Sequence, residues 1–113
     1  MIGLSRKVIT TALTLGVGGL SLIVPLTGAE ARDYTVAIAN MAYGAIPSGL
    51  KVGDTIVWVN RDSVPHTVTA RNHSFDLRLN PGQSSRLALT KAGSYQIYCI
   101  LHSPMRGSFT VGS

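Results

Sequence analysis

The short stretch CILHSPM contains the chain's one cysteine together with a histidine and a methionine, at Cys99, His102 and Met105. The three side chains offer a thiolate, an imidazole and a thioether, which are donors of graded softness. Together they suit copper better than zinc, calcium or magnesium, since zinc would use the cysteine and the histidine but has little use for the methionine. The spacing CxxHxxM therefore predicts a copper site built largely from one loop.

A trigonal copper centre with a weak axial methionine needs two histidines, and this loop supplies only His102. His66 follows a proline, whose fixed φ stiffens the chain, and it opens the strand-like stretch HTVTA. His73 instead lies in the polar stretch RNHSFD, which is typical of a surface loop. We therefore predict that His66 is the second histidine ligand and that His73 is a solvated surface residue.

Each candidate ligand has a simpler interpretation when it is taken alone. A single histidine is usually solvated or hydrogen-bonded, and Met105 by itself would be a gap filler in the core. Met105 follows directly on CxxH, however, and this combination favours a ligand. We assign Met41, which has no such neighbours, to packing, and Trp58, which alternates with other residues along a strand, to the core.

The N-terminus has the order of an export signal: a basic pair, an apolar run over residues 8–24, a proline, and an AxA ending at residues 29–31. Cleavage after Ala31 is predicted, which leaves residues 32–113 as a single small domain; the alternative is an uncleaved membrane anchor. In an oxidising compartment cysteines normally pair, and Cys99 has no partner in the chain. It must therefore be buried, bridged to another chain, or occupied.

The charge of the chain limits its partners. The formal net charge is +5, and removal of the signal, which carries a net +1, leaves about +4. The charges are scattered along the chain, and an exported protein does not meet cellular nucleic acid. We therefore exclude nucleic acid as a partner and favour an acidic protein.

Beyond the signal, short stretches rich in β-branched and aromatic residues predict strands, and no segment has a sustained helical period. The predicted strands are YTVAIA, TIVWVN, HTVTA, SRLAL, SYQIYC and SFTV. Between them, the stretches VGDT, NPGQ and KAGS have the composition of turns. Six or seven short strands at such intervals predict an all-β fold, a small antiparallel sandwich or barrel.

Two longer stretches, KVGDTIVWVNRDSVPH and AGSYQIYCILHSPMRG, resemble the cupredoxins, the small blue copper electron carriers, and in particular their amicyanin-like members. The resemblance extends from about Tyr34 to Val111, and its most specific part is the compact CxxHxxM spacing. It implies a Greek-key β-sandwich with one type 1 copper ion. The implied equatorial ligands are His66, Cys99 and His102, and the implied axial ligand is Met105.

The resemblance also implies a function, that of a periplasmic one-electron shuttle that is not an enzyme. The electron donor and acceptor would be redox proteins, for example a c-type cytochrome or a dehydrogenase. They would dock transiently on an apolar patch of Ile100, Leu101 and Pro104 around His102. We expect a monomer with no membrane span once the signal is cleaved. Candidates for a basic rim that steers an acidic partner are Arg61, Arg71, Arg78, Arg86 and Arg106.

Two other classes of function compete with the shuttle. A periplasmic copper carrier or storage protein would use open, exchangeable sites, whereas a buried cysteine with two histidines and a methionine predicts slow metal exchange. A thiol hydrolase would leave Met105 unexplained. A multicopper oxidase would need a histidine directly before the cysteine, where this chain has Tyr98.

The sequence departs from the family pattern at two positions beside the predicted ligands. Many cupredoxins have an asparagine after the first ligand histidine, which fastens that loop to the ligand loop; here the residue is Thr67, whose single hydroxyl can make fewer hydrogen bonds. Amicyanin-type loops commonly have a proline before the loop histidine, where this chain has Leu101.

Overall fold

The computed structural model describes residues 30–113 of the chain, so the predicted export signal over residues 1–31 lies outside the described residues except for its last two. All regular structure in this part is β-strand, and it holds no helix that could cross a membrane. The strands are β3 (Asp33–Ala39), β4 (Ala42–Tyr43), β5 (Leu50–Lys51), β6 (Thr55–Asn60), β7 (His66–Ala70), β8 (Asp76–Leu79), β9 (Ser84–Ala88), β10 (Gly93–Tyr98) and β11 (Arg106–Gly112).

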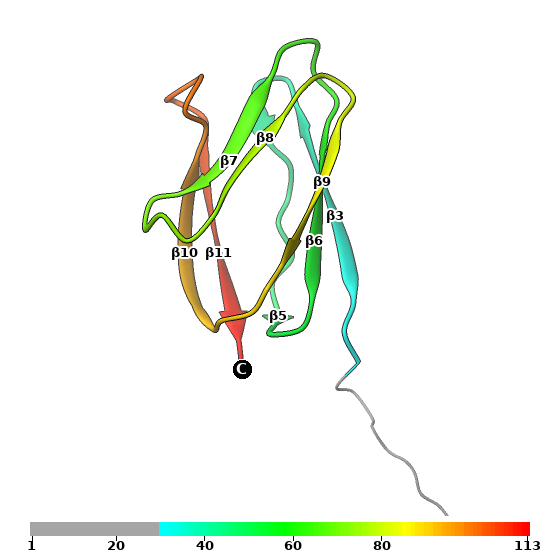
Figure 1. Ribbon diagram of the computed structural model, residues 1–113, viewed down its shortest axis with the longest axis vertical. Helices are drawn as coiled ribbons and strands as arrows, with labels where there is room; N and C mark the ends of the chain where they lie inside the picture. Colours follow the sequence, from blue (N-terminus) through cyan, green and yellow to red (C-terminus); the bar gives the residue numbers. More distant parts are fainter. Residues whose placement is uncertain (1–29) are drawn as a thin grey trace, which may run out of the picture. The chain divides into compact units, whose positions relative to one another are not determined.

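The strands form two sheets that face each other, as Figure 1 shows. One sheet has the order β5-β11-β10-β7-β8 and the other the order β4-β3-β6-β9. The predicted all-β sandwich is therefore confirmed. Each predicted stretch coincides, to within one or two residues at its ends, with an observed strand, and β7 has the same first and last residues as the predicted stretch HTVTA.

The prediction of an antiparallel arrangement is wrong for two strand pairs. β3 runs parallel to β6, with Asp33 opposite Thr55, and β11 runs parallel to β5. Parallel neighbours need a crossover connection. Here the chain leaves β3, adds β5 to the opposite sheet, and only then returns as β6. The strands β4, β5 and β8 were not predicted. β4 and β5 have two residues each, which are too few to show an alternating pattern, and β8 has four residues, DLRL, two of which are charged.

The core lies between the two sheets and follows from the alternation of side chains along each strand. In β6 every second residue is buried, namely Ile56, Trp58 and Asn60. Trp58 is fully buried, as predicted, with its ring edge-on to Tyr43 at 5.7 Å between centroids and tilted against Phe109 at 6.5 Å. This packing holds β6 of one sheet against β11 of the other.

The turns confirm the sequence signals. In the stretch NPGQ, Gly82 has a φ of 79°, as the third position of a type II turn requires, and Gln83 N–H donates to the carbonyl of Asn80 at 2.9 Å. This turn joins β8 of one sheet to β9 of the other, and so contributes to closing the sandwich at that end.

Candidate metal centre

The four predicted ligands come from two connections at the same end of the sandwich (Figure 1). His66 is the first residue of β7. Cys99 follows the last residue of β10, and Met105 directly precedes β11. The loop of residues 99–105 between β10 and β11, here called the ligand loop, carries His102 as well. Since β7 pairs with β10, residues far apart in the sequence meet where these strands begin and end.

Backbone hydrogen bonds explain the spacing of three residues within the ligand loop. The N–H of His102 donates to the carbonyl of Cys99 at 3.3 Å, and the N–H of Met105 donates to the carbonyl of His102 at 2.9 Å. The N–H of Cys99 closes the loop by donating to the carbonyl of Met105 at 3.0 Å. Two consecutive tight turns therefore fix the three residues that carry the donor side chains.

Three of the four side chains converge on one point. The donor atoms of His66, Cys99 and His102 all lie within 4.8 Å of one another. The Nδ1 atom of each histidine lies 3.8 Å from Sγ of Cys99. Metal bonds of about 2.3 Å to sulfur and about 2.1 Å to nitrogen, set at about 120°, would place these donors about 3.8 Å apart. The spacing therefore fits a metal ion held between them.

The surroundings of this cluster are mostly dry. Cys99 and His66 are fully buried and Met105 is 4% exposed, whereas His102 is half-buried. Two imidazoles and a thiolate with a neighbouring methionine are the donor set of blue copper electron-transfer sites. The chemistry of the donors therefore agrees with their spacing.

Hydrogen bonds prepare Cys99 to bind a metal as a thiolate. Burial by itself raises the pKa of the Cys99 thiol, but the N–H of Thr67, the rings of His66 and His102 and the N–H of Leu101 together lower this pKa to about 6. The Thr67 N–H donates to Sγ at 3.3 Å. Because the thiolate is the form that binds metals, the site needs little further deprotonation at neutral pH.

This lowered pKa predicts how the metal-free protein responds to pH. An unfolded cysteine has a pKa of about 8.5, so the folded state holds the thiolate more tightly than the unfolded chain does. The stabilisation is complete above about pH 8.5 and is lost as the pH falls through about 6. Denaturant unfolding of the metal-free protein at pH 5 and pH 8.5 should show this gain, and Cys99→Ser should lack it. An equal pH dependence of the two proteins would contradict the prediction.

Asp62 is a functional residue that the sequence analysis missed. Its Oδ2 lies 2.7 Å from Nε2 of His66, and because a carboxylate only accepts, the Nε2–H of His66 donates to Asp62, while Nδ1 faces Cys99. The N–H groups of Asn40 and Met41 also donate to Asp62, at 2.7 and 2.9 Å. These hydrogen bonds hold the pKa of Asp62 below its usual range, and the bond from the Met41 N–H has the largest effect, followed by the bond from the His66 ring. An acidic residue four positions before a predicted metal-binding histidine was the available signal.

The same contacts correct the interpretation of Met41. It was predicted to pack, but it is 46% exposed and has a φ of 60°, next to Asn40 with a φ of 55°. These left-handed conformations form the turn between β3 and β4, and the Asp62 carboxylate holds both of their N–H groups. Met41 therefore belongs to a strained turn attached to the site, outside the core.

Thr67 fastens the ligand loop despite replacing the asparagine of the family pattern. The N–H of Ile100 donates to its Oγ1 at 2.9 Å, and its own N–H donates to Cys99. Its carbonyl accepts a hydrogen bond from the Tyr43 hydroxyl at 2.6 Å. One threonine thus joins β7 to the ligand loop through both its side chain and its backbone.

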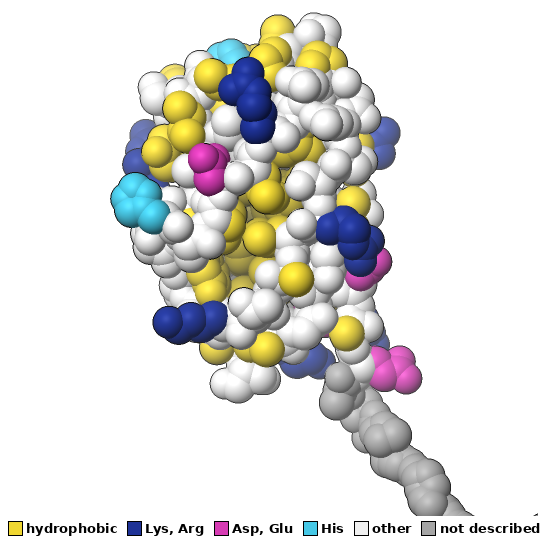
Figure 2. Space-filling model, viewed as in Figure 1, with side chains coloured by type: hydrophobic (Ala, Val, Ile, Leu, Met, Phe, Trp, Pro, Cys, Tyr) yellow, Lys and Arg dark blue, Asp and Glu magenta, His cyan; other side chains and the backbone are white. Residues whose placement is uncertain are grey.

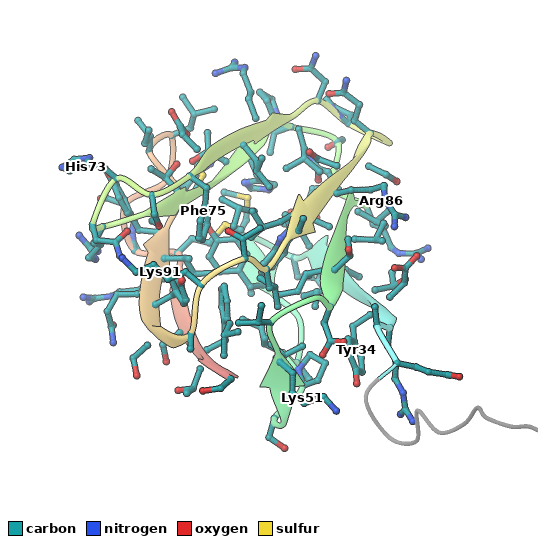
Figure 3. The ribbon with its side chains drawn as sticks, turned by 60° about the horizontal axis from the view of Figure 1, so that its bottom comes forward. Tyr34, Lys51, His73, Phe75, Arg86 and Lys91 are labelled. Carbon is teal, nitrogen blue, oxygen red and sulfur yellow. The ribbon has the colours of Figure 1, made fainter. Side chains whose placement is uncertain are left out.

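His73 lies apart from this cluster. It is exposed in the turn between β7 and β8, has a φ of 67°, and points away from the body of the domain in Figure 3. An apolar groove seen in Figure 2 is also separate, since Phe75, Leu87, Leu89 and Tyr95 line it and none of the candidate ligands does. The chemistry-bearing side chains gather at the ligand loop.

Comparison with known proteins agrees with the β-sandwich fold. The family model described as Cupredoxin-like domain matches residues 14–111. Amicyanin from Paracoccus denitrificans is 34% identical over 95 residues, which cover 77% of this chain and 72% of that protein. Amicyanin from Paracoccus versutus is 29% identical over the same shares of the two chains.

Solved structures of amicyanin variants are also similar to this chain. The Cu(I) form of an amicyanin variant superposes with a TM-score of 0.60 at 34% identity, covering 70% of this chain and 81% of that one. An oxidised amicyanin variant gives a TM-score of 0.61 at 32% identity, covering 75% and 85% of the two chains.

Proposed function

Because the chain belongs to the cupredoxin-like family and is amicyanin-like, we propose that it is a periplasmic type 1 blue copper protein that shuttles single electrons between redox proteins. Copper is its cofactor, and the chain is an electron carrier and not an enzyme. The observation that carries the proposal is the buried Sγ of Cys99, with Nδ1 of His66 and Nδ1 of His102 each 3.8 Å from it.

The proposed ligands have different tasks. His66, Cys99 and His102 would hold the ion, and Met105 would add a weaker thioether ligand. The copper would supply one-electron chemistry by changing between Cu(I) and Cu(II). The hydrogen bonds at Cys99, His66 and the ligand loop keep these side chains in place during that change, which limits rearrangement.

The surface around His102 supports transient docking of a partner. Ile100 is 51% exposed, Leu101 is 42% exposed and Pro104 is also exposed, so an apolar patch surrounds the half-buried imidazole. A small patch of this kind suits the weak contact that a shuttle needs for turnover. We propose a c-type cytochrome or a dehydrogenase as donor or acceptor.

Charges refine the proposed basic rim. Arg86 pairs with Asp33 at 3.0 Å on the other sheet, and Figure 3 places Arg86 at the outer edge of that sheet, so we remove it from the rim. Arg71 lies over the ring of Tyr98, at 4.4 Å from its centroid, next to the ligand loop. The rim that we propose consists of Arg61, Arg71, Arg78 and Arg106, and it would steer an acidic partner.

The periplasmic location rests on the predicted export signal, which the sequence supplies. Mass spectrometry of the protein purified from the periplasm tests it: we expect a mature chain that begins at Arg32.

Addition of Cu(II) to the purified protein tests the function. We expect an intense thiolate-to-copper charge-transfer band in the orange-red that bleaches on reduction and returns on reoxidation, with copper kept throughout. A copper carrier would instead lose Cu(I) quickly to a modest competing chelator and exchange electrons slowly with a cytochrome c. That second pattern would reject the shuttle, because a buried Cys99 and His66 predict slow loss of the metal.

A further inference from the structure

A continuous series of hydrogen bonds joins the ligand loop to solvent on the outer side of β7 and β8. The N–H of Ile100 donates to Oγ1 of Thr67 at 2.9 Å, and that hydroxyl lies 2.9 Å from Oγ1 of Thr69. Thr69 Oγ1 in turn lies 2.8 Å from Oδ1 of Asp76. Thr67 is 3% and Thr69 is 6% exposed, whereas Asp76 is exposed on β8, directly opposite Thr69.

Chemistry gives this series a single direction. A hydroxyl carries one proton and a carboxylate only accepts, so the Thr69 proton goes to Asp76. The geometry also lets the Thr69 hydroxyl donate to Oγ1 of Thr67, but its one proton goes to the stronger, charged acceptor, Asp76. Thr67 therefore donates to Thr69, and its lone pairs remain available to the N–H of Ile100. Each donor therefore points toward the carboxylate, and a series that ends on a charge is stronger than the same bonds between neutral groups.

We propose that Asp76 is a positioning residue for the copper-binding loop and that it acts through Thr69 and Thr67; this rests on the proposed function only in naming the metal. Its charge orients two buried hydroxyls, which then hold the backbone beside Cys99. The asparagine of the family pattern fastens the loop with its own amide, whereas this chain uses a threonine that depends on a remote carboxylate.

The series matters because Thr67 touches both sides of the site. It directly follows His66, and its N–H donates to Sγ of Cys99 at 3.3 Å. If Asp76 is removed, the Thr69 proton turns back toward Thr67, and the Thr67 proton is left without an acceptor among the described residues. A buried hydroxyl that loses its partner weakens the bonds on either side of it.

Amide hydrogen exchange of Ile100, followed by NMR in the metal-free and Cu(I) proteins, tests the proposal. Asp76→Ala and Thr69→Val should each speed this exchange by about tenfold, the size expected for loss of one charge-assisted hydrogen bond. The double variant should exchange no faster than either single variant, because both break the same series. Thr69→Ser keeps the hydroxyl and should restore the wild-type rate. Asp33→Ala, which removes an exposed carboxylate from the other sheet, is the matched control and should change nothing.

The outcomes separate the two proposals. If Thr67→Val speeds the exchange of Ile100 but Asp76→Ala and Thr69→Val do not, the series ends at Thr67 and the inference is overturned. Additive effects in the double variant would overturn it as well. Absence of a blue copper band in the wild type would reject the proposed function, while exchange in the metal-free protein would still decide the role of Asp76.

Discussion

Replacement of Cys99 by serine is expected to abolish the intense visible band of the copper-loaded protein. The band requires a thiolate bound to Cu(II), and Cys99 is the one cysteine in the chain. Its Sγ is also one of the three clustered donor atoms, 3.8 Å from Nδ1 of both His66 and His102. Loss of an outer-shell partner costs about 10- to 100-fold in metal affinity, so loss of this ligand should weaken Cu(II) binding by more than about 100-fold.

Absorption spectra and Cu(II) titrations of the purified variants provide the measurement. His73→Ala is the control, since this exposed histidine lies outside the cluster and should leave both colour and affinity unchanged. A Cys99→Ser protein that stays blue, or a His73→Ala protein that turns pale, would contradict the assignment of the ligands.

Replacement of Asp62 by asparagine should raise the reduction potential of the bound copper. A carboxylate that accepts the Nε2 proton makes the His66 imidazole a stronger donor, and a stronger donor favours Cu(II) over Cu(I). The amide of asparagine is neutral and removes this preference. We expect Cu(II) binding to weaken by about tenfold relative to Cu(I), which corresponds to a rise of about 59 mV for one electron.

Protein-film voltammetry of the variants gives these potentials directly. Because Asp62 also holds the turn at Asn40 and Met41, a variant of the turn alone is needed as a control. Met41→Gly relieves the left-handed conformation and keeps the carboxylate, so its potential should stay at the wild-type value. Asp33→Asn controls for the loss of a distant charge. An unchanged or lower potential in Asp62→Asn would reject the role of this carboxylate.

Local sequence was sufficient for the features that act over a few residues. The alternation in TIVWVN predicted the buried face of β6 with Trp58, and the stretch HTVTA predicted β7. The spacing CxxHxxM grouped three donor residues because two short backbone turns fix residues three apart. The pair Pro81 and Gly82 predicted a type II turn because only a residue free to adopt a positive φ fits its third position.

Tertiary structure decided the features that depend on residues far apart in the chain. His66 and Cys99 are 33 positions apart, and they meet because β7 and β10 are neighbours in one sheet. The parallel pairs arose from a crossover between the sheets, which no strand pattern records.

The outer-shell contacts of the site were likewise beyond the reach of sequence patterns. Asp62 binds His66 because the connection before β7 folds back over the site, and the same fold brings the β3–β4 turn to the carboxylate. Asp76 reaches the ligand loop only because strand register sets it opposite Thr69. The sequence by itself thus determined which groups can bind copper, since ligand chemistry belongs to residue types. The register of the strands decided which carboxylates and hydroxyls support them, because a hydrogen bond depends on position in space.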